Sequence, residues 1–219
     1  MNMYFISGLG ADKRVFQKIK LPEGYTPHHI SWIPHRRNET LAQYARRLSA
    51  VIDTKLPFVL IGLSFGGMLA VEICRFLKPG KTILISSAAH SKMLPPYIRF
   101  LKWLPLHKAL PYFLLKKPTR IVYWLFGIRA KGEKILFDRI LYDTDISFLR
   151  WAMHAIITWP ERKPPNHIIQ IHGSEDTLLP LRFVKADYVI QGGNHFMVYS
   201  HAWEVSAVLA QVLGGKKEE

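Results

Sequence analysis

Five residues in the first third of the chain have the types and spacing of a nucleophilic serine site. Gly62-Leu63-Ser64-Phe65-Gly66 ends an apolar run at residues 58–63 and opens a helical pattern at residues 65–77. A tight turn between a strand and a helix strains the serine backbone and exposes its hydroxyl at the edge of a sheet. The alternative is a glycine-rich turn with an ordinary serine. We interpret Ser64 as the nucleophile.

One of the ten histidines is placed to serve as the base that such a serine needs. An expected strand at residues 188–190 leads into Gln191-Gly192-Gly193-Asn194 and then His195. The imidazole therefore lies on a loop just past a strand, and the two glycines permit a close turn. An ordinary surface or core histidine is the alternative. The position predicts that His195 takes the proton of Ser64.

A carboxylate is needed to orient that imidazole, and Asp176 has the position for it. It lies in the loop that follows the expected strand at residues 167–171. Glu175 is the competing acid. His172 is close to Asp176 in sequence, but we interpret it as a packing residue of the turn that leaves the strand.

Short apolar runs alternate with amphipathic stretches along the chain. The expected strands cover residues 3–6, 28–33, 58–63, 82–85, 167–171 and 188–190. The expected helices begin near residue 39, at residue 65 and at residue 202. Strands that alternate with helices predict an α/β fold, with a parallel sheet and helices on both of its faces.

The segment at residues 87–160 breaks this alternation, because it carries repeated prolines and no convincing strand. We predict a core formed by residues 1–86 and 161–219, with residues 87–160 as a helical cap insertion. Its aromatic residues either line an acyl pocket or fasten the cap helices to the core. They are Tyr97, Phe100, Trp103, Tyr112, Phe113, Tyr123, Trp124 and Phe126.

The formal charge of +14 is concentrated in this insertion, where residues 87–132 hold nine Lys or Arg and no Asp or Glu. Such a field attracts anionic partners such as phosphate groups, acyl carriers or acidic lipid. Lys102, Lys108, Lys116, Lys117 and Arg120 lie among the aromatic residues. This mixture resembles an interfacial surface and leaves contact with a membrane open, although solubility alone also explains it. No zinc spacing or recognition-helix pattern supports nucleic-acid binding.

The single cysteine, Cys74, excludes an intramolecular disulfide and reads as a small buried thiol. No apolar run approaches the length needed to span a bilayer, and residues 1–6 lack the features of a signal peptide. We expect a cytoplasmic protein, and the sequence indicates no oligomeric state.

The order of Ser64, Asp176 and His195 resembles the α/β-hydrolase fold superfamily, and these signatures bracket almost the whole chain. The resemblance implies a Ser-Asp-His triad at these positions and an oxyanion hole from the backbone N–H groups of Phe65 and Leu9. Ser7 stands where the family usually has histidine. Only six residues precede that loop, so we expect a trimmed, all-parallel sheet of about six strands.

The resemblance implies a compact serine hydrolase that cleaves a carboxylic ester or thioester of a small-molecule, possibly anionic, acyl substrate. The sequence shows no metal-ligand spacing and no phosphate loop, so we expect neither a metal nor a cofactor. A C–C hydrolase or lyase with the same triad is one alternative. A non-catalytic, basic membrane-surface or binding module on a hydrolase scaffold is another.

Overall fold

A parallel sheet of six strands forms the centre of the molecule, and the computed structural model describes residues 1–103 and 116–214 around it. The strands are β1 (Asn2–Ile6), β2 (Thr26–Ile30), β3 (Phe58–Leu63), β4 (Lys81–Ile85), β5 (Ile168–Gly173) and β6 (Tyr188–Ile190). All five neighbouring pairs are parallel. The predicted α/β fold with a trimmed parallel sheet is confirmed. The second strand lies slightly earlier than predicted.

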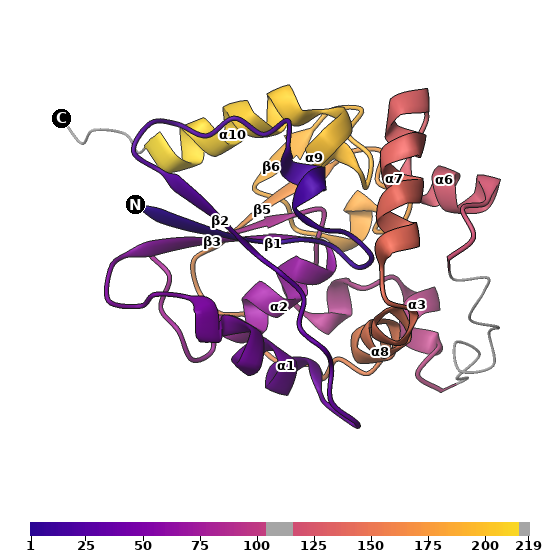
Figure 1. Cartoon of the computed structure of the whole chain (residues 1–219), viewed down its shortest axis with the longest axis horizontal. Helices are drawn as coiled ribbons and strands as arrows, with labels where there is room; N and C mark the ends of the chain where they lie inside the picture. Colours follow the sequence, from indigo (N-terminus) through magenta and orange to yellow (C-terminus); the bar gives the residue numbers. More distant parts are fainter. Residues whose placement is uncertain (104–115, 215–219) are drawn as a thin grey trace.

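Helices cover both faces of the sheet (Figure 1). One face carries α1 (Leu41–Leu48) and α2 (Phe65–Ile73), and the other carries α9 (Met197–Ser200) and α10 (Ala202–Gly214). Successive side chains of a strand point to opposite faces. Leu60 of β3 accordingly packs in the layer of Tyr44, whereas Ile61 packs in the layer of Leu209. This double burial explains the continuous apolar run of the third strand.

The strand order β2-β1-β3-β4-β5-β6 places a change of direction between β1 and β3. The chain leaves β1 for the edge strand β2 and then returns to the other side of β1. In open parallel sheets, ligands bind outside the carboxyl ends of the strands at such a point. The turn that carries Ser64 follows β3 at this point.

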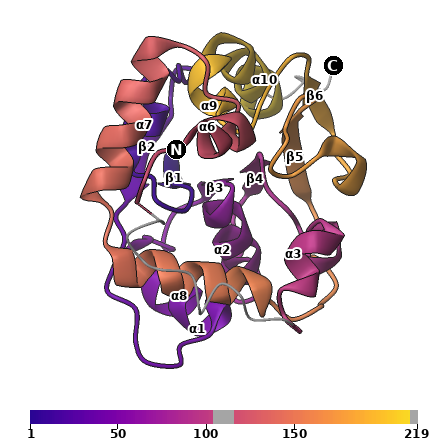
Figure 2. The same cartoon turned by 90° about the vertical axis from the view of Figure 1, so that its right-hand side faces the viewer.

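The segment at residues 87–160 places its described helices over the carboxyl ends of the strands (Figures 1 and 2). These are α3 (Pro96–Phe100), α6 (Arg120–Phe126), α7 (Lys131–Asp143) and α8 (Ile146–Ile157). The last of them also joins the core, because Trp151 donates its indole N–H to the carbonyl of Glu39 at 2.8 Å. Within the described residues, no helix combines the length and apolar character needed to cross a bilayer.

Cys74 follows α2 and is partly buried. Its sulfur lies 3.0 Å from the hydroxyl oxygen of Thr82. Burial raises the pKa of this thiol, so it stays protonated and unreactive at neutral pH.

Candidate active site

The turn between β3 and α2 holds Ser64 in a strained conformation, with φ +50° and ψ −117°. Glycines make the turn possible because neighbouring backbone approaches them closely. A Cβ atom at Gly62 would lie 2.4 Å from the Cα of Gly67, and one at Gly66 would lie 2.3 Å from the carbonyl oxygen of Ile6. Side chains at these positions are therefore sterically excluded.

Hydrogen bonds from the end of β4 fix the backbone of Ser64. Its N–H donates to the carbonyl of Ile85 at 2.9 Å, and its carbonyl accepts the hydroxyl of Ser87 at 2.6 Å. Sequence reasoning missed Ser87, because only its position after a strand marked it. These bonds hold the strained turn in one orientation.

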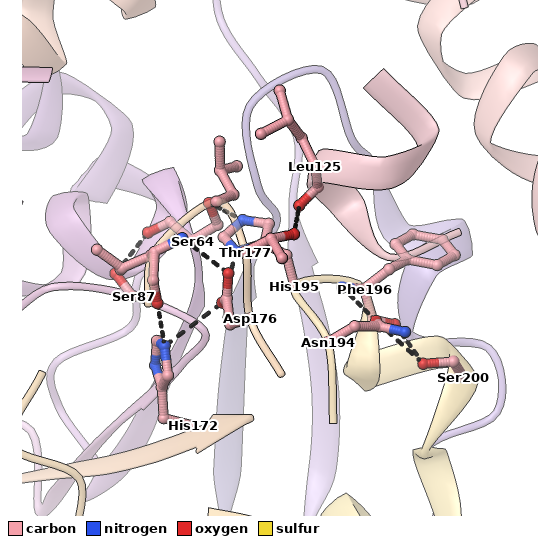
Figure 3. Close-up of polar contacts among 12 residues, drawn as sticks. Ser64, Ser87, Leu125, His172, Asp176, Thr177, Asn194, His195, Phe196 and Ser200 are labelled. Atoms are coloured by element: carbon pink, nitrogen blue, oxygen red, sulfur yellow. Dashed lines mark hydrogen bonds and ion pairs between the residues drawn. The ribbon is translucent and has the colours of Figure 1, made fainter. Parts of the chain in front are cut away.

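The imidazole of His195 lies between the two other predicted site residues (Figure 3). Its Nε2 is 2.9 Å from Ser64 Oγ, and its Nδ1 is 2.8 Å from Asp176 Oδ2. A carboxylate accepts but does not donate, so Nδ1 carries the proton and Nε2 is free to accept the serine proton. The structure thus brings together three side chains that are far apart in sequence.

Asp176 rather than its neighbour Glu175 faces this imidazole. Asp176 is only 3% exposed, and its Oδ1 accepts the N–H of Leu179 at 2.7 Å. Glu175 turns to solvent and pairs with Arg129 at 3.1 Å, with about half of its side chain exposed. The backbone bond at Leu179 fixes the carboxylate, so its second oxygen is directed at His195.

A second histidine lies against the same carboxylate. His172 is fully buried, donates from Nε2 to the carbonyl of Leu179 at 2.7 Å, and places that nitrogen 3.4 Å from Asp176 Oδ2. Its Nδ1 has no hydrogen-bond partner in the described structure. Burial lowers the pKa of His172, and the carboxylate only partly offsets this effect. A neutral His172 therefore supports Asp176, beyond the packing role predicted from sequence.

The loop after β1 runs directly beside the nucleophile. A Cβ atom at Gly8 would lie 3.3 Å from Ser64 Cβ, and Leu9 lines the cavity described below. Phe65 begins α2, and the first N–H groups of a helix have no partner within it. The structure thus places both predicted oxyanion-hole residues around Ser64.

Ser7, which stands where the family usually has histidine, keeps this loop closed. Its buried hydroxyl donates to the carbonyl of Ala11 at 2.8 Å, and the N–H of Ala11 donates to Gly8 at 3.0 Å. The indole of Trp32 donates to the carbonyl of Ala11 at 2.7 Å. The loop keeps a defined turn with serine at this position.

A cavity of about 290 Å³ opens beside Ser64 and His195. Apart from these two residues, every lining side chain in the described part of the chain is apolar, and none of them is permanently charged. Phe126 lines it and stands edge-on to the His195 ring at 5.4 Å between centroids. The cavity suits an uncharged, aliphatic group.

The aromatic residues of the insertion line the cavity, pack within the insertion or are exposed to solvent. Phe126 lines the cavity, and Tyr123 packs against Phe137 at 6.2 Å between ring centroids. Those that are largely exposed are Tyr97, Phe100, Trp103 and Trp124. Tyr112, Phe113 and Lys108 lie outside the described residues. The predicted aromatic acyl pocket is therefore mostly aliphatic in the part described, with Leu94, Ile98 and Ile156 among its walls.

The carboxyl end of α6 is held by the loop that carries Asp176. The hydroxyl of Thr177 lies 3.0 Å from the carbonyl oxygen of Trp124 and 2.9 Å from that of Leu125. The last carbonyls of a helix lack intrahelical partners, so a neighbouring group must satisfy them. Here the residue next to the predicted acid does so.

The loop that carries His195 holds the same helix end. The amide of Asn194 donates to the carbonyl of Gly127 at 2.8 Å, and the N–H of Phe196 donates to the carbonyl of Phe126 at 3.2 Å. Sequence reasoning missed these contacts, although a glycine at the end of α6 marked where the helix stops. The predicted acid and the predicted base thus share one anchor.

Comparison with protein families agrees with this arrangement. The family model described as "Alpha/beta hydrolase family" matches residues 3–208. The chain belongs to this family. The resemblance stated from the sequence is therefore confirmed. Comparison with curated proteins found no relative of this alpha/beta hydrolase.

Solved structures share the fold at low identity. An esterase from Exiguobacterium antarcticum has a TM-score of 0.74 and 16% identity, over 98% of this chain and 92% of the other. MenH from S. aureus has a TM-score of 0.73 and 13% identity, over 98% and 93%. A thermophilic esterase from Thermogutta terrifontis has a TM-score of 0.66 and 15% identity, over 98% of this chain and 89% of the other. At such identities the likeness shows the fold and leaves the reaction to the site.

Proposed function

We propose that this alpha/beta hydrolase is a serine hydrolase that cleaves a carboxylic ester or thioester through an acyl-enzyme on Ser64. One observation carries the proposal. The line from Ser64 Oγ through His195 to Asp176, at 2.9 and 2.8 Å, is continuous and opens into an apolar cavity. A buried carboxylate, a base and a strained serine in this arrangement can activate a hydroxyl.

In the first step, Oγ of Ser64 forms a bond to the substrate carbonyl carbon while Nε2 of His195 takes the hydroxyl proton. The carbonyl oxygen becomes an oxyanion, and the N–H groups of Phe65 and Leu9 would stabilise it. One such donor contributes about 10²–10³ to the rate in serine hydrolases. The carbon–oxygen or carbon–sulfur bond then breaks, and His195 returns the proton to the leaving alcohol or thiol.

Water completes the reaction from the same side. His195 takes a proton from the water as its oxygen attacks the acyl-enzyme, and Ser64 recovers the proton when the carboxylic acid leaves. Asp176 holds the proton-bearing Nδ1 throughout and stabilises the imidazolium that forms in each step. No group outside the three side chains and the two N–H donors is required.

The cavity supports an aliphatic acyl group of limited length. At about 30 Å³ for each non-hydrogen atom, a volume of about 290 Å³ holds on the order of ten atoms. Among the described residues that line it, only Ser64 and His195 have polar side chains, so a charged group deep inside would lack a charged partner. We place an anionic part of the substrate, if present, outside the cavity, where residues 87–132 carry nine Lys or Arg and no acid.

We also propose that residues 87–160 act as a cap on a core of residues 1–86 and 161–219. The support is that α3, α6, α7 and α8 each supply apolar side chains to the cavity wall: Ile98, Phe126, Phe137, Ile140 and Ile156. The cytoplasm is the proposed compartment, because the only cysteine leaves no intrachain disulfide to form.

A fluorophosphonate probe tests the nucleophile. It should label the wild type and spare Ser64→Ala, whose folding is checked by its circular dichroism and melting temperature. Labelling of both proteins, or of neither, overturns the assignment. A panel of p-nitrophenyl esters and acyl thioesters of increasing chain length then tests the reaction. Strong labelling without turnover of any ester or thioester would favour the C–C hydrolase or lyase alternative.

A further inference from the structure

The helix at one side of the cavity mouth carries apolar side chains on two sides. In α3 and the turn that follows it, Ile98 and Leu101 line the cavity. Tyr97, Phe100 and Trp103 are instead 52%, 61% and 81% exposed, and the hydroxyl of Tyr97 donates to the carbonyl of Leu178 at 3.1 Å. Helical residues three apart share one side, so the exposed rings form a row distinct from the lining residues.

The helix on another side of the mouth, α6, shows the same division. Phe126 lines the cavity, whereas Ile121 and Trp124 are 68% and 65% exposed. The sequence of α6, RIVYWLF, is apolar at every position except the first. A helix that is apolar all round is normally buried, so the outer side of α6 is expected to meet a partner.

Exposed basic residues are neighbours in sequence of these exposed apolar residues. We define the aromatic–basic surface as Tyr97, Arg99, Phe100, Lys102, Trp103, Lys117, Arg120, Ile121 and Trp124, all of them exposed. Both helices lie at the same end of the molecule, beyond the carboxyl ends of the strands (Figures 1 and 2). No Asp or Glu occurs anywhere in residues 87–132. Glu175, which pairs with Arg129, shares a hollow with Arg120 and Trp124. The surface therefore combines apolar side chains with a net positive charge.

We propose that the aromatic–basic surface docks on an anionic lipid bilayer and turns the cavity mouth toward its acyl chains. Bulky apolar side chains ringed by Lys and Arg are the combination that inserts shallowly into lipid while pairing with acidic headgroups. The cavity behind the surface accepts only apolar groups, which is the chemistry of a lipid chain. The delivery of acyl chains rests on the proposed function, but the docking does not depend on Ser64.

A bilayer fits better than an acidic protein partner. The exposed rings sit on two separate helices around an opening, and aromatic residues with one polar edge favour the boundary between headgroups and acyl chains. The cytoplasmic leaflet of a membrane is negatively charged and therefore complements this positively charged surface. An acyl carrier protein is the alternative occupant, and the experiment separates the two.

The test measures co-sedimentation of full-length Ser64→Ala with vesicles, so that turnover cannot alter the lipid. We expect binding to phosphatidylcholine vesicles that contain phosphatidylglycerol, weakened by salt, and little binding to phosphatidylcholine alone. Each basic residue near an anionic surface contributes about fivefold to binding. Lys102→Glu with Arg120→Glu should therefore weaken binding at least about tenfold. Trp103→Ser with Ile121→Ser should also weaken it, by loss of insertion.

Matched controls lie outside the surface. Trp203 on α10 is 74% exposed, so Trp203→Ser removes an equally exposed ring elsewhere. Lys78 is exposed and precedes the amino end of β4, so Lys78→Glu makes the same charge change as either single reversal, at the opposite edge of the sheet. Both control variants should bind like the parent.

Two results would overturn the docking proposal. The first is no salt-sensitive binding to anionic vesicles, whether or not an acyl carrier protein binds instead. The second is an equal loss of binding in the control variants. Fluorophosphonate labelling of the wild type is scored separately. Vesicle binding without labelling would reject the hydrolase and keep the docking surface, whereas labelling without vesicle binding would do the reverse.

Discussion

The amide of Asn194 donates to the carbonyl of Gly127 at 2.8 Å and so joins the residue before His195 to the end of α6. Gly127 has φ +70°, and a Cβ atom on it would lie 2.2 Å from the Cβ of Asn194. The helix end and the loop of the base can meet this closely only because position 127 has no side chain. His195 is thus positioned by a helix that also lines the cavity.

Replacement of Gly127 by alanine should therefore disturb catalysis. The left-handed conformation costs alanine about 1–2 kcal/mol, and the clash adds to it. A displacement of His195 by about 1 Å lowers the rate by up to about 10². We expect Gly127→Ala to lower both the melting temperature and kcat for a p-nitrophenyl ester. Gly132→Ala is the control, since a Cβ atom there meets nothing within 4 Å. Equal losses of melting temperature and kcat in both variants would refute the proposal that Gly127 positions His195.

Replacement of Asp176 should lower kcat far more than replacement of its neighbour Glu175. Asp176→Asn keeps the shape but favours the wrong tautomer of His195, so kcat should fall by about 10⁴. Glu175→Gln, whose side chain only pairs with Arg129 at the surface, should leave kcat within about twofold, because exposed pairs contribute little. Steady-state kinetics of the two variants measures this. A larger loss in Glu175→Gln would reverse the assignment of the acid.

His172 should make stability depend on pH in the mildly acidic range. Burial lowers the pKa of His172 in the folded state, so below its ordinary value of 6.5 the unfolded chain binds more protons than the folded chain. Its contribution to stability is complete above pH 6.5 and is lost as the pH falls toward the lowered pKa. The slope is at most about 1.4 kcal/mol per pH unit.

Urea unfolding at pH 7, 6 and 5 measures this dependence. We expect the unfolding free energy of His172→Gln to fall less steeply with pH than that of the wild type. Burial also lowers the pKa values of His29 and His90, so part of the dependence should remain. An unchanged slope in His172→Gln would show that His172 binds protons equally in the folded and unfolded states, contrary to its burial.

The cavity wall should set the length of the acyl chain. Ile156 lines the cavity from α8, so Ile156→Phe should fill part of it and exclude long acyl groups. Each buried methylene contributes about 0.8 kcal/mol, or about fourfold. Loss of room for two of them should lower the kcat/KM ratio of octanoate to acetate p-nitrophenyl ester about fifteenfold. Ile135→Phe, at an exposed position on α7, is the control. A change of equal size in Ile135→Phe would argue against the cavity as the acyl site.

Local patterns made the sheet and the three predicted site residues accessible from sequence. The apolar run before Ser64, and the loops that follow the fifth and sixth strands, are signals contained within about ten residues. The topology of a parallel sheet then brings their carboxyl ends to one edge. The Ser-Asp-His geometry therefore needed only strand order and loop position.

The remaining features depend on contacts between distant segments. The aromatic composition of the insertion did not reveal that Trp103 faces solvent while Phe126 faces the cavity, because direction depends on how each helix packs. Nor does composition show that the indole of Trp151 donates to the carbonyl of Glu39, or that the hydroxyl of Thr177 donates to the carbonyl of Leu125. Neither of the two local sequences that form such a pair indicates the contact between them.

The shared anchor at the end of α6 has a consequence for behaviour on warming. Local segments of a protein open with lower free energies than the whole fold. If the hydrogen bonds of Thr177 and Asn194 at this helix end break, the loops of Asp176 and His195 lose a common support at the same time, although the sheet and both of its buried layers stay intact. Thermal inactivation should therefore precede thermal unfolding, with a temperature interval in which the chain is folded but catalytically inactive.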